Sequence, residues 1–441
     1  MHPTGCGWRK SPTYRPSLVG ETEQVRHGAL PCLQTHYRSS IVKPTKQLGS
    51  VLTPALRRAT KGQIGWDDEE RGGAYMPAID LRELMLDVPI EAALGRGYGF
   101  VRTGDEELPR TPLPTLTYPS MRLQQWVEIC NQRLLPVPAP GCLFFQRLMV
   151  YGPGHVLLGD DILVEPSEMS GVAVQWHSNQ RNSIPTRQRR VVSVPVIVVI
   201  TPGYLIYGHW LADILPRIAV AQSTLGPAFS DWALLLPSNT PAFALEMCSV
   251  FLGAAPRVEF YDYDTEIITA EQICVPTSPV SMEHNFHSLT QCFFKPYQAP
   301  TLGNRKLCLS RARIEGRTNG AVKSFPQRDF FESCARLHGF EIVYPEEHSI
   351  IGQIELFQSA RAIVGEYGSG LHNSIFAASG AIVGATGYFN TYQQRLCEMA
   401  GQRNTFVIPY EEEDQAGVKA YACAEPEISE MFKAIDAALG G

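Results

Sequence analysis

Long apolar runs are missing from this sequence. The longest, residues 191–200, has the length of a strand and is interrupted by Ser193 and Pro195, so we expect no membrane-spanning helix. The opening residues MHPTGCGWRK lack the hydrophobic core of a secretory signal, and we expect none. Net positive charge is missing too. The 38 Lys and Arg residues against 44 Asp and Glu give a net charge of -6, which argues against nucleic acid as the main partner.

Metal-binding cysteine pairs and the dinucleotide-binding fingerprint are also absent. Eleven cysteines are scattered without a C-x-x-C, which is typical of buried thiols in a reducing compartment. No G-x-G-x-x-G follows a strand-like run, which argues against a dinucleotide-dependent oxidoreductase. Two short motifs remain. We interpret His284 and His287 as loop residues, with a metal site as a minor alternative, and the D-x-D at residues 262–264 as a chance match.

The remaining composition is that of a globular α/β protein. With 441 residues, 44% hydrophobic and 19% charged, the chain is long enough for two to three domains with substantial cores. Residues 1–75 are broken by prolines and mostly basic, and we interpret them as an irregular, solvated extension. Contact with an anionic membrane surface, or a transit peptide, are the alternatives for this extension.

Strand-like and helix-like runs alternate along the rest of the chain in two blocks. In the first block, after a mixed start, we expect helices at 121–135, 208–220 and 242–252, and strands at 143–151, 172–176, 191–200, 233–236, 258–261 and 272–275. In the second we expect strands at 306–309, 341–344, 362–364, 381–385 and 406–408, and helices at 327–338, 349–359, 371–378, 391–400 and 428–439. Such alternation builds doubly wound parallel sheets. We therefore predict two Rossmann-like lobes that face a cleft, at residues 76–300 and 301–441.

A glycine-rich bend at residues 364–373, VGEYGSGLHN, connects a strand to a helix of the second block. Backbone N–H groups in such a bend can approach an anionic ligand, and the helix N-terminus adds positive potential. A plain strand–helix turn without a ligand is equally compatible with the local sequence. Glu366, His372 and Asn373 flank the bend, and each is either a ligand contact or a structural cap.

The segment YGHWLADILPR at residues 207–217 follows the strongest strand of the first block. His209 and Asp213 are four residues apart, so on a helix they share a face and can form a hydrogen bond. A carboxylate beside an imidazole orients it and raises its pKa, which suits a general base. A purely structural pair is the alternative. We favour function, because open α/β sheets bind ligands at the carboxyl ends of their strands. Pro216 should kink the helix.

A third cluster is basic and follows the first strand of the second block. Arg311 and Arg313 leave the end of that strand, and Arg317 lies a few residues further on. Arginines in this position can bind phosphate oxygens in a bidentate manner. A solvated basic loop is the alternative interpretation. It is the less favoured of the two here, because the same block carries the glycine-rich bend.

The order of these motifs resembles glycosyltransferase family 61. They are G-H-W-x-x-D-x-L-P-R, then L-S-R with a later Arg and Asn, then S-x-x-x-Q-x-x-x-F-x-x-A, and last G-E-x-G-S-G-L-H-N, over roughly residues 191–409. The resemblance implies a GT-B-type architecture, a nucleotide-sugar donor in the later lobe, inversion at the anomeric carbon, and no required metal or cofactor. It implies donor-site roles, strongest for Arg311, for the following residues: Arg311, Arg313, Arg317, Gly368, Ser369, Gly370, Leu371, His372 and Asn373.

Glycosyl transfer needs a base for the proton of the acceptor hydroxyl and positive charge for the departing diphosphate. Asp213, alone or through His209, is the preferred base, and Glu366 is the second choice. The resemblance further implies a glycan acceptor, cell-surface polysaccharide such as capsule as the product, and a cytoplasmic location, peripheral to the membrane at most. The alternative function is a non-catalytic carbohydrate-binding or scaffold protein with the same fold.

Overall fold

The computed structural model describes residues 78–80, 87–158, 161–164, 170–253, 256–281, 284–314, 322–387, 391–415 and 418–440. The predicted extension at 1–75 lies outside these residues. All the elements below belong to one compact unit, Thr53–Gly441. Within the described ranges, no helix has both the length and the apolar character needed to span a bilayer. The mixed α/β class is confirmed.

One sheet contains four neighbouring parallel strands in the order β10-β9-β8-β12. They are β8 (Val196–Ile197), β9 (Ala233–Pro237), β10 (Val258–Tyr261) and β12 (Ile273–Pro276). Helix α6 (Leu215–Leu225) connects β8 to β9, and α7 (Ala242–Leu252) connects β9 to β10. The chain then returns to place β12 on the other side of β8. The strand order therefore reverses between β8 and β12, and open α/β sheets bind ligands at such a switch point.

Antiparallel strands extend this sheet, and a second sheet is built from strands that are interleaved with its own along the chain. Strands β3 (Gly141–Phe145) and β2 (Tyr98–Arg102) follow β12 in the sheet order, and α2 (Ile90–Arg96) packs beside β2. The other sheet has the order β1-β6-β5-β4-β11-β7. Its strands are β1 (Ala78–Asp80), β4 (Met149–Tyr151), β5 (His155–Leu158), β6 (Asp161–Val164), β7 (Gln188–Val192) and β11 (Glu266–Ala270).

Three sequence predictions in this part are wrong. Residues 143–151 do not form one strand, because they are divided between β3 and β4, which belong to different sheets. Residues 172–176 lie in helix α4 (Ser170–Gln180), not in a strand, because Ala173, Val174 and His177 are buried with the spacing of one helix face. Residues 191–200 do not form one strand. They are divided between β7 and β8, which belong to different sheets. Pro195, which has no backbone N–H to donate to a ladder, lies where the chain passes from one sheet to the other.

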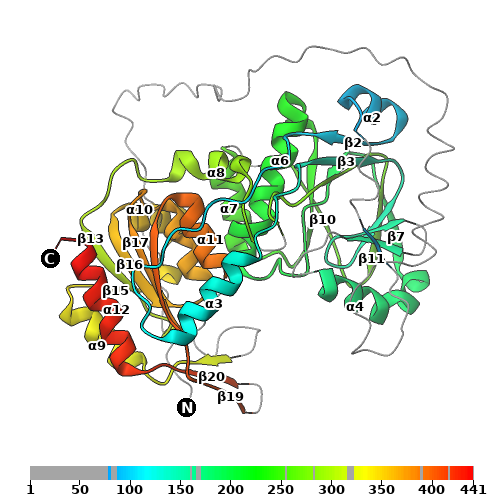
Figure 1. The fold of residues 1–441 in the computed structure, drawn as a ribbon. Helices are drawn as coiled ribbons and strands as arrows, with labels where there is room; N and C mark the ends of the chain where they lie inside the picture. The colour runs from blue at the N-terminus through cyan, green and yellow to red at the C-terminus, as the bar shows by residue number, and fades with distance from the viewer. Residues whose placement is uncertain are drawn as a thin grey trace, which may run out of the picture. The chain divides into compact units, whose positions relative to one another are not determined.

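The five-stranded sheet of the later block is entirely parallel, with the order β15-β13-β16-β17-β18. Its strands are β13 (Arg305–Leu309), β15 (Glu341–Val343), β16 (Ala360–Glu366), β17 (Ile382–Thr386) and β18 (Arg403–Val407). Helices α9 (Arg328–Leu337) and α12 (Glu425–Ala438) cover one face (Figure 1). Helices α10 (Ile350–Gln358) and α11 (Thr391–Ala400) cover the other. The strand order reverses between β13 and β16.

Most elements predicted in this block are confirmed, and the differences are local. Ser349 caps α10 by accepting a hydrogen bond from the N–H of Gly352. The helix predicted at 371–378 is a 3₁₀ helix, Ser369–Phe376, that begins inside the glycine-rich bend. A small sheet of β14 (Val322–Ser324), β20 (Val418–Ala422) and β19 (Glu411–Gln415) has no counterpart in the sequence predictions.

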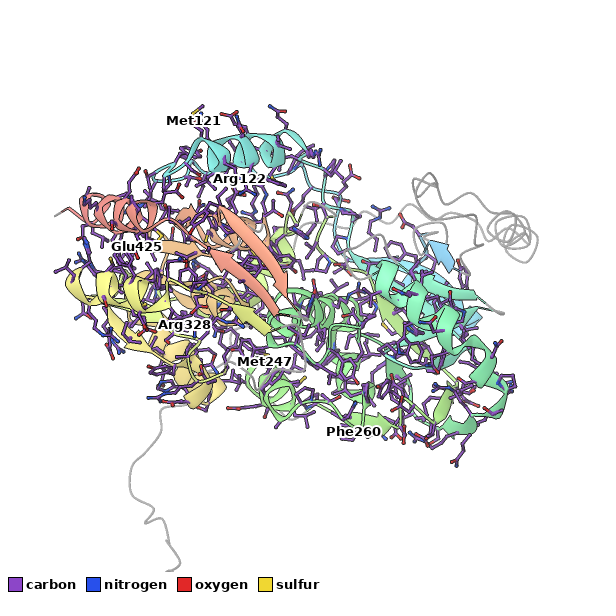
Figure 2. All side chains as sticks on the ribbon, turned by 90° about the horizontal axis from the view of Figure 1, so that it is seen from below. Met121, Arg122, Met247, Phe260, Arg328 and Glu425 are labelled. Atoms are coloured by element: carbon purple, nitrogen blue, oxygen red, sulfur yellow. The ribbon has the colours of Figure 1, made fainter. Side chains whose placement is uncertain are left out.

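An early segment, residues 113–132, packs on this later sheet. The Leu116 N–H donates to the carbonyl of Asn404 in β18, and Arg122 of helix α3 (Met121–Gln132) donates to the carbonyl of Pro409. Met121 is 78% exposed and points outward in Figure 2. The segment thus lies within the sequence block 76–300 but packs against the sheet formed by the block 301–441.

Candidate functional site

The predicted site residues follow the strands that flank the two switch points. His209 and Asp213 lie on the helical segment after β8. Arg311 follows β13, and Glu366 ends β16 just before the glycine-rich bend. Each cluster therefore lies at the carboxyl edge of a parallel sheet, beside the point where the strand order reverses.

The helix that carries His209 contains one turn of π-helix. The short α5 (Tyr207–His209) passes into the π turn at Trp210–Ile214 and then into α6. The N–H of Leu215 bonds to the carbonyl of Trp210, five residues earlier, and Pro216 has no N–H to donate. Pro216 was predicted to kink the helix. The structure has a wider, π-helical turn just before this proline. Such π turns are frequent at functional sites.

Asp213 accepts two hydrogen bonds from two different parts of the chain. Its Oδ2 lies 2.5 Å from His209 Nδ1, and its Oδ1 accepts from the Tyr392 hydroxyl of α11 at 2.7 Å. Burial by itself raises the pKa of Asp213, but the hydrogen bond and charge of His209 oppose it. With further help from Tyr392 and Arg217, the net pKa is lowered. Asp213 is therefore held ionised and is well suited to orient the His209 ring.

The glycine-rich bend lies against the first basic residue of the arginine cluster. A Cβ built on Gly368 would lie 1.9 Å from Nη1 of Arg311, so only glycine leaves room for the guanidinium here. The backbone at Gly368 is extended, with φ 170°, and its role is therefore close approach rather than an unusual conformation. Arg311 and the bend thus form one surface, as predicted for a donor diphosphate site.

Glu366 is buried and forms an ion pair with Arg328, which lies at the start of α9 and is labelled in Figure 2. Nε of Arg328 donates to Oε1 at 2.6 Å and Nη2 donates to Oε2 at 3.2 Å. Since both carboxylate oxygens bind one guanidinium, Glu366 suits a positioning role better than that of a base. A small pocket beside it is lined by Arg311, Phe325, Glu366, Tyr367, Thr386 and Tyr421.

The bend also contacts the helix that carries His209. A Cβ on Gly208 would lie 2.8 Å from the His372 ring and 2.9 Å from Ser369 Oγ. The adjacent Tyr207 hydroxyl lies within hydrogen-bonding distance of the Asn373 side-chain oxygen, at 2.8 Å. The glycine-rich bend therefore contacts the helix that carries His209 directly. Through Gly368 it also contacts Arg311 of the basic cluster.

His372 is buried and neutral. Burial lowers its pKa to about 4, although Gln393 bonds to Nδ1 at 2.9 Å. Because the Gln393 amide donates to Ser374, its oxygen faces His372, and Nδ1 of the ring carries the proton. Leu371 and Asn373 are fully buried as well, which gives this part of the bend a packing role in addition to any ligand contact.

Arg313 is engaged away from Arg311. Arg313 pairs with Glu347, and its guanidinium lies 3.7 Å from the centre of the Tyr344 ring. Arg317 lies outside the described residues, as does Asn319. Tyr392 and Arg328 are absent from the sequence predictions because they lie in ordinary helices and no motif marks them.

The two minor metal motifs have structural roles. The Asp262 carboxylate accepts the N–H groups of Asp264 and Thr265, which closes the turn after β10. The His287 ring accepts the Leu289 N–H and so caps α8 (Ser288–Phe294). Both interpretations from the sequence, as a loop histidine and an incidental D-x-D, agree with these contacts.

Comparison with known proteins adds one finding. Residues 207–384 match the family model described as Glycosyltransferase 61. The match begins at the tyrosine that opens α5 and ends within β17, so it spans all three clusters. No curated protein matches the chain significantly.

Proposed function

We propose that this chain, whose residues 207–384 match the family model of glycosyltransferase family 61, is an inverting glycosyltransferase that uses a nucleotide-sugar donor and requires no metal. The observation that carries this proposal is a chain of contacts. Arg311 lies against Gly368, the bend continues to Ser369, and Ser369 lies against Gly208, next to His209. Groups suited to a diphosphate and groups suited to an acceptor hydroxyl are thus neighbours.

In this mechanism His209 is the base and Asp213 orients it. The Nδ1–H of the ring faces Asp213, so Nε2 is the basic nitrogen of the neutral imidazole. The acceptor hydroxyl attacks the anomeric carbon from the side opposite the diphosphate and gives its proton to Nε2. The sugar–phosphate bond breaks, and its electron pair leaves with the diphosphate. Of the predicted choices, Asp213 acting through His209 has the best geometric support.

Donor binding is the role of Arg311 and the bend. The guanidinium supplies two parallel donors for phosphate oxygens, and the N–H groups at the start of the 3₁₀ helix add further donors. The two sheets that carry the clusters, each beside a switch point, support a GT-B-type arrangement with the donor on the later sheet. We retain Arg313 and Arg317 as candidates of lower rank.

The cellular setting is also a proposal. A glycan or other hydroxyl-bearing acceptor, with cell-surface polysaccharide as the product, fits a cytoplasmic enzyme that works at or near the inner face of a membrane. The donor sugar is to be identified among UDP-, GDP-, CMP- and dTDP-sugars by thermal shift.

The test is a calorimetric titration of the full chain with the nucleotide diphosphate of the best donor, with and without EDTA. We expect binding in both conditions, at least tenfold weakened in Arg311→Ala. Asp213→Asn should keep this binding but lower transfer turnover by about 10²–10⁴. Equal affinity in Arg311→Ala, or normal turnover in Asp213→Asn, would contradict the assigned roles. Absence of any donor binding would favour a non-catalytic scaffold.

A further inference from the structure

A row of aromatic side chains lies beside the candidate site and takes no part in it. Trp176 of α4 and Tyr263, in the turn after β10, have ring centres 6.4 Å apart with planes inclined by 34°. Tyr204 follows, with its ring centre 6.3 Å from that of Tyr263. Trp176 and Tyr263 are half-buried, whereas Tyr204 is buried. Two partly exposed rings are therefore supported by a third.

Specific contacts fix the first ring of this row. A Cβ on Gly152 would lie 2.3 Å from the Trp176 ring, and Gly152 has φ 55°, so glycine both makes the turn and leaves room for the indole. The Tyr261 hydroxyl donates to the carbonyl of Gly152 and accepts the N–H of Gly154. The turn on which Trp176 rests is thereby tied to β10.

The second ring is fixed through its backbone. Arg187 is 8% exposed, and its Nη1 donates to the carbonyl of Tyr263 at 2.7 Å. Its guanidinium also lies 5.8 Å from the centre of the Trp176 ring. On the other side, Asp262 accepts the N–H groups of Asp264 and Thr265. Both partly exposed rings are therefore positioned by these contacts.

The row leads to His209. Tyr204 adjoins Gly203, and a Cβ on Gly203 would lie 2.7 Å from the His209 ring. The carbonyl of Tyr204 accepts the indole N–H of Trp210, the residue after His209, at 2.6 Å. The Tyr204 hydroxyl donates to the exposed Asn239, in the loop after β9. The loops after β8, β9 and β10 thus bring Tyr204, Tyr263, Asn239 and the proposed base to one sheet edge, and Trp176 of α4 packs against Tyr263.

We propose that Trp176 and Tyr263 form a stacking surface for a sugar ring of the acceptor, with Asn239 and Asp264 as its polar rim. This inference rests on the proposed function, which requires a saccharide acceptor next to His209. Rigid aromatic rings give a large contact area at little cost in conformational entropy. Exposed amide and carboxylate groups beside them provide acceptors and donors for sugar hydroxyls.

The test uses the full chain and four defined probes: cellotetraose, xylotetraose, chitotetraose and mannotetraose at millimolar concentration. Binding is measured by saturation-transfer difference NMR, and nucleotide-sugar affinity is measured separately by calorimetry. We expect at least one oligosaccharide to bind, and Trp176→Ala and Tyr263→Ala each to weaken that binding about tenfold. The affinity for the nucleotide sugar should stay unchanged in both variants.

Trp126→Ala is the matched control, because Trp126 is 49% exposed on α3, and it should bind the oligosaccharide like the parent. If Trp176→Ala does not fold, Tyr263→Ala carries the test, since its turn is held by backbone contacts. The proposed stacking surface would be contradicted if none of the four probes bound, or if the variants bound the oligosaccharide as tightly as the parent. If the variants lose oligosaccharide binding while the parent chain binds no nucleotide sugar, the stacking surface would be supported and the proposed function would be contradicted.

Discussion

At the scale of single residues, the most informative side chain is Asp213, because both of its oxygens are engaged. His209 lies on one oxygen and Tyr392 donates to the other. A carboxylate fixed in this way cannot turn toward a substrate, but it can hold an imidazole in one tautomer and one orientation. Tyr392 is accordingly a positioning residue that acts through Asp213.

We predict that Tyr392→Phe lowers kcat by roughly 10-fold and leaves the nucleotide-sugar affinity unchanged. The phenylalanine keeps the ring packing but removes a hydrogen bond to a charged group, worth about 1.5–3 kcal/mol. Steady-state kinetics over a range of pH measure this loss, and the profile should shift as well, because Asp213 would regain part of its ordinary basicity. Tyr410→Phe, at a tyrosine that is 57% exposed, is the control. An unchanged kcat in Tyr392→Phe would remove the residue from this role.

The buried neutral His372 makes a second prediction, for stability. Its pKa is about 4 in the folded protein against an ordinary value of 6.5, so between these values the unfolded chain binds a proton that the folded protein does not. Stability must therefore fall as the pH falls through this window, by about 2 kcal/mol between pH 7 and pH 5. Urea unfolding of His372→Gln should show a pH dependence smaller by that amount. The exposed His348 provides the control His348→Gln, and a parent-like slope in His372→Gln would refute the assignment.

The sequence predicted the residues of the site better than their partners. His209 with Asp213 follows from a four-residue spacing on a helix, and Arg311 follows from its position after a strand. Arg328 and Tyr392 could not be found in this way, since their role comes only from tertiary contacts with residues 38 and 179 positions away. Glu366 was correctly placed at the bend, but its ion pair was not foreseen.

At the scale of elements, the glycine-rich bend makes a steric prediction. Gly368→Ala should weaken nucleotide-diphosphate binding about as much as Arg311→Ala, because the new Cβ displaces the guanidinium. Little stability should be lost, since the backbone there is extended and the displaced group is the end of a flexible side chain. Calorimetry and thermal unfolding measure the two effects.

Gly95→Ala is the control for that variant, because a Cβ at Gly95 would meet no atom within 4 Å. If Gly368→Ala binds the nucleotide with the affinity of the parent, Arg311 is not held where the diphosphate role requires it.

The elements that sequence patterns predicted well have helix periodicity or lie in the parallel core. Helix α7 and helix α11 have the predicted bounds, since their neighbours and caps agree with their apolar spacing. Residues 191–200 were misassigned because an unbroken apolar run does not reveal a change of sheet at Pro195. The 3₁₀ form of residues 369–376 was missed because it depends on the packing of the bend, and local propensity carries no sign of it.

At the scale of the whole molecule, a buried ion pair within α11 also forms hydrogen bonds to the early segment 113–132. Arg395 and Glu398 have side chains only 1% and 2% exposed. Glu398 also accepts the N–H of Leu113, and Arg395 donates to Asn131. A pair this deeply buried is costly to break, because removal of one partner leaves the other charge without compensation.

We therefore predict that Glu398→Gln lowers the free energy of unfolding by about 3–5 kcal/mol. Glu341→Gln, which breaks the exposed pair with Arg305, should cost at most about 1 kcal/mol and serves as the control. Chemical denaturation measures both. A cost for Glu398→Gln that does not exceed the control would mean that the pair is not a structural link between the segment and α11.

The contact between Thr115 and Asn404 joins residues 289 positions apart, and it has a consequence for biosynthesis. A ribosome that adds about 5–20 residues per second needs roughly 15–60 s to supply the second partner after the first. During that interval helix α3 has been synthesised, but the strand β18 against which its segment packs has not. Expression of residues 301–441 as a separate fragment would leave the β18 edge uncovered, so a truncation intended to isolate the donor half should retain residues 113–132.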